Sequence, residues 1–147
     1  MTTSNDLEAL RQDPEALWNP TATVNWSLPF SPAFGSWLQM LNWQALGEPE
    51  LAEISKKWFY ASLAVLFAQA VMGLSSSDEQ HGYTIAQVFG LVYLLIWYYG
   101  SARPHLKYVK ERFGNDYNRR PWKIPLLFAA GIMGMLITLR VIVGIII

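Results

Sequence analysis

The side chains best suited to chemistry are few and widely separated along the chain. There are two histidines, His81 and His105, and no cysteine, which excludes disulfides, thiolate catalysis, iron–sulfur clusters and cysteine-ligated zinc. Asp78 and Glu79 stand close to His81, but such a short polar connection is typical of a solvated turn. No Ser-His-Asp set, glycine-rich phosphate loop or metal-spaced His-Glu motif can be assembled from the residues present. We therefore predict that the protein is not an enzyme and has no catalytic residue, metal site or cofactor.

Three polar residues inside long apolar stretches are better candidates for a functional site. Gln69, Gln87 and Arg140 each lie in a different stretch, and each is five to seven residues from the same end, so all could share a layer roughly 7 to 10 Å below a membrane boundary. An arginine in hydrocarbon is costly unless it reaches the interface or meets side-chain carbonyls. The pattern predicts an intramembrane polar layer of these three residues. The alternative is that Arg140 extends to the headgroups and has only a structural role.

The apolar stretches themselves predict membrane-spanning helices. Residues 58–77 and 83–101 carry no Asp, Glu, Lys, Arg or His, and residues 124–145 carry only Arg140. A helix crosses the hydrocarbon core with about 20 predominantly apolar residues. Apolar side chains make up 52% of the chain and charged ones only 15%, which leaves little material for a separate soluble domain. We predict an all-α integral membrane protein with three transmembrane helices at about these positions.

The distribution of charge predicts the orientation of the helices. The connection 103–123 is strongly basic, whereas the connection 75–82 has two acids and no base. Because basic connections stay in the cytoplasm, we place the C-terminus on the outer side. Trp58, Trp97 and Trp122 then fall at the cytoplasmic interface, where tryptophan is enriched. The bases of this cytoplasmic basic belt are Arg103, Lys107, Lys110, Arg112, Arg119, Arg120 and Lys123.

The region before the first span divides into two parts. Residues 1–23 form an acidic N-terminal segment, and residues 24–47 are uncharged but rich in Trp, Pro and Gly. From residue 33 the apolar spacing becomes helical, and Gly47 is a suitable stop. We predict an interfacial or re-entrant helical segment here, ahead of the membrane domain of residues 48–147. Pro49 fits the first position of a helix that continues through the first span.

A second, amphipathic helix is predicted within the basic belt. Between His105 and Phe113, Leu106 and Val109 share a face with Phe113, and most charged residues lie opposite. Gly114 marks its end. The expected partner is the lipid bilayer, with each base contributing about 1 kcal/mol near an anionic surface. The neighbouring aromatic residues are better explained as interfacial anchors than as nucleic-acid stacking groups, so we predict no nucleic acid partner.

Three phrases in the Trp/Pro/Gly segment carry a resemblance. They are Asn25-Trp26-Ser27-Leu28, then Phe30-Ser31-Pro32-Ala33-Phe34-Gly35, then Asn42-Trp43-Gln44-Ala45-Leu46-Gly47. This segment resembles one found in small bacterial inner-membrane proteins that have no assigned function. The resemblance implies a location in the bacterial inner membrane, and it supplies no reaction, ligand or catalytic residue; the multi-pass arrangement is predicted from the apolar stretches.

Three function classes remain open on the sequence. Pairs of small residues four apart, such as Ala130 and Gly134, favour close helix contacts, so we expect a homo-oligomer or a subunit of a membrane complex. The favoured class is therefore a non-enzymatic scaffold or accessory subunit. The second is an oligomeric channel or pore lined by the polar layer. The third is a membrane sensor or protective binding protein that recognises its target through Trp26, Phe34 and Trp43.

Overall fold

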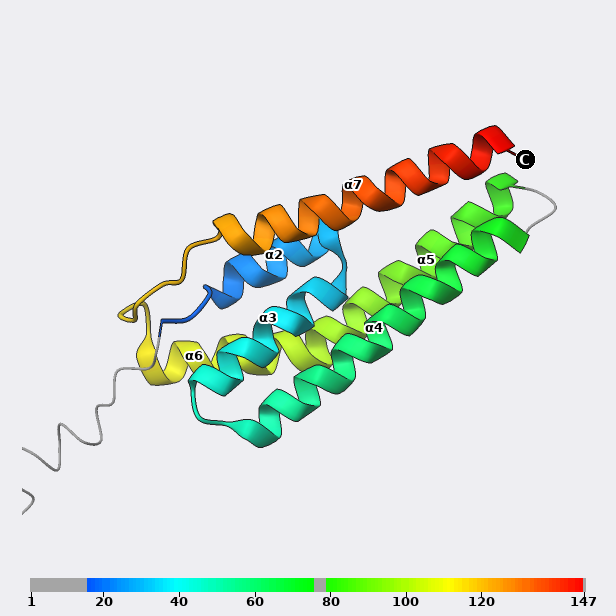
Figure 1. Ribbon diagram of the computed structural model, residues 1–147. Helices are drawn as coiled ribbons and strands as arrows, with labels where there is room; N and C mark the ends of the chain where they lie inside the picture. Colours follow the sequence, from blue (N-terminus) through cyan, green and yellow to red (C-terminus); the bar gives the residue numbers. More distant parts are fainter. Residues whose placement is uncertain (1–15, 76–78, 147) are drawn as a thin grey trace, which may run out of the picture.

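The computed structural model describes residues 16–75 and 79–146 and is helical throughout them apart from short connections (Figure 1). In chain order the elements are α2 (Pro20–Phe30), α3 (Pro32–Ala45), α4 (Pro49–Ser75), α5 (Glu79–Trp97), the π-helix η1 (Tyr98–Ala102), α6 (Arg103–Phe113) and α7 (Lys123–Ile146). The described residues form no strand, only an isolated bridge between Leu17 and Arg119. The predicted all-α class is confirmed.

Helices α2 and α3 form an antiparallel hairpin, and two of its three prolines mark where helices begin, while Pro29 lies in the last turn of α2. Asn19 caps α2 because its Oδ1 accepts the backbone N–H of Thr21 at 3.0 Å, and Pro20 takes the first helical position. Ser31 separates the helices with a φ of 85°, and Pro32 begins α3. Figure 1 shows the open end of the hairpin on the side of α6 and its turn between α7 and α4.

The helical segment predicted to begin at residue 33 is thus confirmed as a helix, and it has a partner helix that the sequence did not indicate. No helix was predicted before residue 33, where the chain carries Pro20, Pro29 and Pro32. Proline is tolerated in the first turn of a helix because its missing N–H would have no partner there. Two prolines of this segment therefore start helices instead of preventing them.

Helix α4 begins at Pro49, as predicted, and α5 returns beside it (Figure 1). From α5 the chain continues without a break through η1 into α6, and Gly114, with a φ of 58°, ends this long helix. The amphipathic helix is therefore confirmed, but it extends α5 instead of standing alone. The buried residues of α6 are His105 and Val109, so a histidine occupies a position on the inner face that the sequence assigned to apolar side chains.

One helix in the described residues is both long enough and apolar enough to cross a membrane, and it is Gly82–Phe113. The described side chains of α7 add a shorter apolar stretch, Lys123–Thr138. The third predicted span lies within α7, which has 24 residues, and residues 58–75 of the first lie within α4, which has 27. Both helices are long enough to cross a hydrocarbon core, which takes about 20 residues, and the three-span arrangement stays a prediction.

The interior is assembled around α3 and is rich in polar groups. Trp97 is fully buried, and Thr23, Ser27, Asn42 and Ser36 are equally inaccessible. Trp97, which was predicted to lie at the cytoplasmic interface, is enclosed by protein: its indole packs against α3 and donates a hydrogen bond to Ser36 Oγ at 2.8 Å. Trp58 and Trp122, by comparison, are only partly buried.

Glycine at position 35 allows the helices to meet closely at Trp97. A Cβ on Gly35 would lie 2.5 Å from Cζ2 and 2.7 Å from Cη2 of the Trp97 ring, and it would also meet Ser27 Oγ. Real Cβ atoms do not approach other atoms this closely. The contact of α2, α3 and the Trp97 ring therefore depends on the absence of a side chain at this position.

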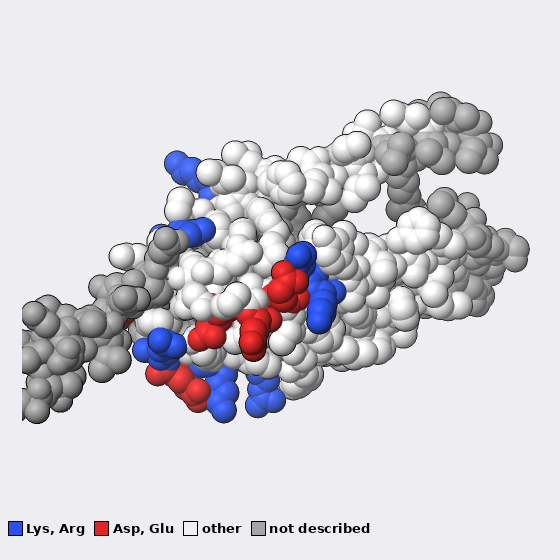
Figure 2. Space-filling view, turned by 60° about the horizontal axis from the view of Figure 1, so that its bottom comes forward, with Lys and Arg blue, Asp and Glu red and all other residues white. Residues whose placement is uncertain are grey.

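The outer surface has the opposite character, because large apolar side chains cover α4, α5 and α7. Among the most exposed are Phe67, Ile85, Val88, Leu91, Ile124, Leu127, Met135 and Ile137. Figure 2 shows the described Lys, Arg, Asp and Glu side chains of one face gathered over one end of the molecule, with uncharged residues over the rest. Soluble proteins rarely expose contiguous apolar surface on this scale.

Helix α7 is attached mainly through its first half. Ala129 is buried with Phe34 and Leu38 in an apolar cluster, and the Phe128 ring lies 5.6 Å from that of Trp37. In the connection before α7, Asn118 O accepts from the Leu17 N–H at 2.9 Å. Further along, positions 131 and 134 face open space, because a Cβ on either glycine would meet nothing within 4 Å.

Candidate functional site

Two members of the predicted polar layer meet at one cavity. Gln69 Nε2 donates a hydrogen bond to the backbone O of Ala86 at 2.8 Å, which ties α4 to α5. Gln69 and Gln87 both line a cavity of about 400 Å³ between the α2–α3 turn and the α4–α5 pair. The side chain of Arg140 lies outside the described residues, so its membership of the layer stays a prediction. Gly90 makes room for Gln69, whose amide would collide with a Cβ there.

Most of the basic belt is engaged by aromatic rings and acids on the molecule's own surface. Four arginines stack on rings: Arg103 over Tyr99 at 5.7 Å, Arg112 over Tyr108 and Phe113 at 5.7 Å each, Arg119 over Tyr117 at 5.6 Å and Arg120 over Trp18 at 4.6 Å. Lys107 pairs with Glu111 at 3.7 Å on the exposed face of α6, while Lys110 and Lys123 stand at exposed positions. Such exposed pairs contribute up to about 1 kcal/mol each. The belt therefore presents a surface, not an enclosed binding pocket.

One member of the belt helps to fasten α6 to the start of α4. Arg112 Nη1 donates to Tyr108 Oη at 2.6 Å, and Tyr108 Oη donates to Glu48 Oε1 at 2.7 Å. Partial burial, with a smaller contribution from this bond to Glu48, raises the pKa of Tyr108. The phenol therefore stays protonated as a donor at neutral pH.

The predicted recognition residues occupy different environments. Trp26 is 37% exposed and stacks on Phe30 with ring centroids 5.8 Å apart. Phe34 and Trp43 are buried, the first under α7 and the second against His105. Only Trp26 is thus available at the surface of this conformation. Recognition through the segment stays a prediction, and two of its three aromatic rings already stabilise the fold.

A row of polar contacts, here called the polar seam, joins α3 to the long helix through η1. It consists of the pairs Ser36–Trp97, Gln39–Ser101 and Trp43–His105. Ser101 Oγ donates to Gln39 Oε1 at 2.8 Å, and the Trp43 ring meets His105 edge-on at 4.8 Å. The seam was not predicted. Its only signal in the sequence is the four-residue spacing of 97, 101 and 105, which places these residues on one helix face.

The polar seam contains three buried nitrogen atoms that no described group bonds. They are Nε2 of Gln39 and both ring nitrogens of His105. Burial lowers the pKa of His105 to about 3, so the imidazole is neutral at pH 7. A buried donor or acceptor without a partner costs about 1 to 3 kcal/mol. The π-helix η1 lies at this position, and such insertions are frequent at functional sites.

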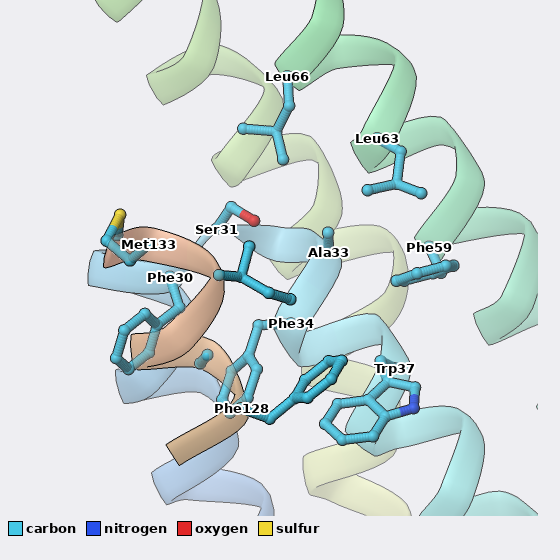
Figure 3. Close-up of a pocket in the computed structure, with 12 residues that line it drawn as sticks. Phe30, Ser31, Ala33, Phe34, Trp37, Phe59, Leu63, Leu66, Phe128 and Met133 are labelled. Atoms are coloured by element: carbon cyan, nitrogen blue, oxygen red, sulfur yellow. The ribbon is translucent and has the colours of Figure 1, made fainter. Parts of the chain in front are cut away.

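A second hollow is an apolar groove of about 500 Å³ between α4 and α7, with α3 as its floor (Figure 3). Figure 3 shows Phe59, Leu63 and Leu66 on the α4 wall, Phe128 and Met133 on the α7 wall, and Phe34 and Trp37 beneath. Ser31 is the only residue in the lining with a polar side chain that can hydrogen-bond, apart from the Trp37 indole. The groove therefore suits an apolar occupant and offers no group for catalysis.

Comparison with known proteins adds no assignment: the chain matches no family model, and no curated protein or solved structure gives a significant match.

Proposed function

We propose that the protein is a multi-pass membrane protein of the bacterial inner membrane that acts as a non-enzymatic scaffold or accessory subunit. Its support is the inverted distribution of polarity: serine, glutamine and histidine are buried while leucine, isoleucine and phenylalanine are exposed along α4, α5 and α7. In water such a surface would aggregate, whereas in lipid it needs no cover. Helices α4, α5 with η1, and α7 would be the three spans.

The α2–α3 hairpin would be re-entrant in this arrangement. Its two ends lie on the side of the basic belt, and its turn reaches between α4 and α7 (Figure 1). Backbone at membrane depth is tolerated where other protein covers it, and α3 packs extensively on α4. With the belt in the cytoplasm, the hairpin would enter from the cytoplasmic side and return to it.

The partner surface would be the exposed face of α7. Ala130 and Gly134 stand on it four residues apart, and the space beyond Gly131 and Gly134 is empty. Small residues at this spacing let a second helix approach closely in lipid, where van der Waals contact drives association. The described side chains of α7 beyond Met133, at 134–138, 141 and 142, are all exposed, so they would be available to a partner.

The proposal is tested by the composition of complexes extracted in native lipid particles. We expect Gly134→Leu to reduce the fraction of chain that carries a partner polypeptide or second copy about fivefold, which corresponds to about 1 kcal/mol of helix contact. The matched control is Ala70→Leu, another small-to-large change at an exposed position, on α4. A wild-type chain that is always extracted alone would contradict the proposal, as would an equal loss in both variants.

A further inference from the structure

We propose that the apolar groove binds one acyl chain of an anionic phospholipid, whose headgroup is held by lysines at the start of α4 and α7. The site rests on the membrane placement proposed above and goes beyond it. The helix association proposed for α7 gives the apolar groove no role, whereas lipid binding would give it one.

The size and lining of the groove fit an acyl chain better than a protein segment. Its volume of about 500 Å³ lies within the range of about 300 to 1,000 Å³ typical of small-molecule sites. One turn of helix with side chains, about 10 Å wide and 5.4 Å tall, already fills about 400 Å³. A partner helix could therefore place only one turn there, whereas a flexible chain can follow the groove along its length.

In the proposed membrane placement, the groove is open toward lipid on one side and closed by protein on the other. Leu63 and Ile132, from opposite walls, are 43% and 47% exposed, so the groove is open laterally between α4 and α7. Phe34 at its floor is buried. An acyl chain from the bilayer could enter through this opening without any movement of the fold, and it would cover aromatic surface that bulk lipid reaches poorly.

Charge at one end of the groove selects the headgroup. Lys56 stands one helical turn before Phe59 on the α4 wall, and Lys123 stands five residues before Phe128 on the α7 wall. Along each helix these separations are about 4.5 and 7.5 Å. Glu53 pairs with Lys56 at 3.1 Å on the surface, and Lys123 leaves α7 about 140° around the helix from Phe128, so both lysines would meet the phosphate at the level of the headgroups and not inside the groove. A phospholipid with its phosphate at this end and one acyl chain in the groove would match both the positive charge of the lysines and the apolar lining.

Lipid binding to the detergent-purified, delipidated full chain would be measured by native mass spectrometry with added phosphatidylglycerol or phosphatidylcholine. We expect one tightly held phosphatidylglycerol per chain. Leu63→Trp, which fills the groove from an exposed position, is expected to weaken binding about tenfold. Leu95→Trp is the matched control, since Leu95 is 52% exposed and does not line the groove. Lys123→Gln is expected to reduce the preference for phosphatidylglycerol about fivefold.

The proposal is overturned if Leu63→Trp, with an unchanged circular dichroism spectrum, binds lipid as the wild type does. It is also overturned if Leu95→Trp loses as much binding, or if delipidated wild type is a dimer that Leu63→Trp dissociates, because a second copy would then occupy the groove. If Leu63→Trp does not fold, the same lipid-binding measurement is made with Ile132→Trp, on the opposite wall, and the same outcomes apply. A chain released from membranes by alkaline carbonate would instead contradict the membrane placement itself, so the two failures are distinguishable.

Discussion

Replacing Trp97 by alanine is expected to lower the free energy of unfolding by about 3 to 5 kcal/mol, the range observed when a fully buried large aromatic side chain is removed. The ring is completely inaccessible, and it fills the space that Gly35 leaves open between α2 and α3. Its loss would leave a cavity at the meeting point of the hairpin and the long helix. It would also deprive Ser36 Oγ of its indole donor, which bonds it at 2.8 Å.

The measurement is equilibrium unfolding in mild detergent, followed by helical circular dichroism as a denaturing detergent is added. Trp97→Phe separates packing from hydrogen bonding, since it keeps an aromatic ring while removing the N–H; we expect it to cost about 1 to 3 kcal/mol. Tyr99→Ala is the matched control, because Tyr99 is 60% exposed two residues away. Equal losses for Trp97→Ala and Tyr99→Ala would show that Trp97 is not the buried centre of the fold.

Much of the helical framework could be predicted from the sequence, because its signals are local. Uncharged stretches long enough for a membrane, Pro49 at a helix start and Gly114 at a helix end each depend on a few neighbouring residues. Helix α2 was missed for a local reason as well: proline disfavours the interior of a helix but is tolerated in its first turn. Asn19, the cap that precedes Pro20, was the signal that could have revealed it.

The site could not be predicted to the same extent, because it depends on contacts between distant segments. Gln39 and Ser101 are 62 positions apart, and no periodicity within either helix specifies that pairing. The usual guide that buried residues are apolar also fails here, since the exposed surface of α4, α5 and α7 is apolar while serine, glutamine and histidine side chains are buried. Trp97 was accordingly placed at the interface, and the apolar groove between α4 and α7 was not foreseen.

Acidification is expected to destabilise the folded chain through His105. The ring is 1% exposed and lies on α6, in the basic connection beyond the proposed second span. Burial lowers its pKa from 6.5 to about 3, so between these pH values the unfolded state binds a proton that the folded state does not. Stability is therefore unaffected above pH 6.5 and falls by about 1.4 kcal/mol per pH unit below it, about 3 kcal/mol by pH 4.

Two variants separate the effect of protonating His105 on stability from the cost of its buried ring nitrogen atoms that lack a partner. His105→Leu removes both, so we expect unfolding measured at pH 7 to be no easier than in the wild type, with this part of the decline toward pH 4 absent. His105→Gln removes only the titration and keeps buried polar atoms, which leaves the pH profile equally flat but the chain less stable than His105→Leu, by about 1 to 3 kcal/mol.

An unaltered acid profile in both variants would mean that His105 does not stay neutral inside the fold. A flat profile in both, with the two stabilities equal, would instead mean that a group such as water already bonds the nitrogen atoms of the polar seam, because only unsatisfied atoms make the glutamine costly.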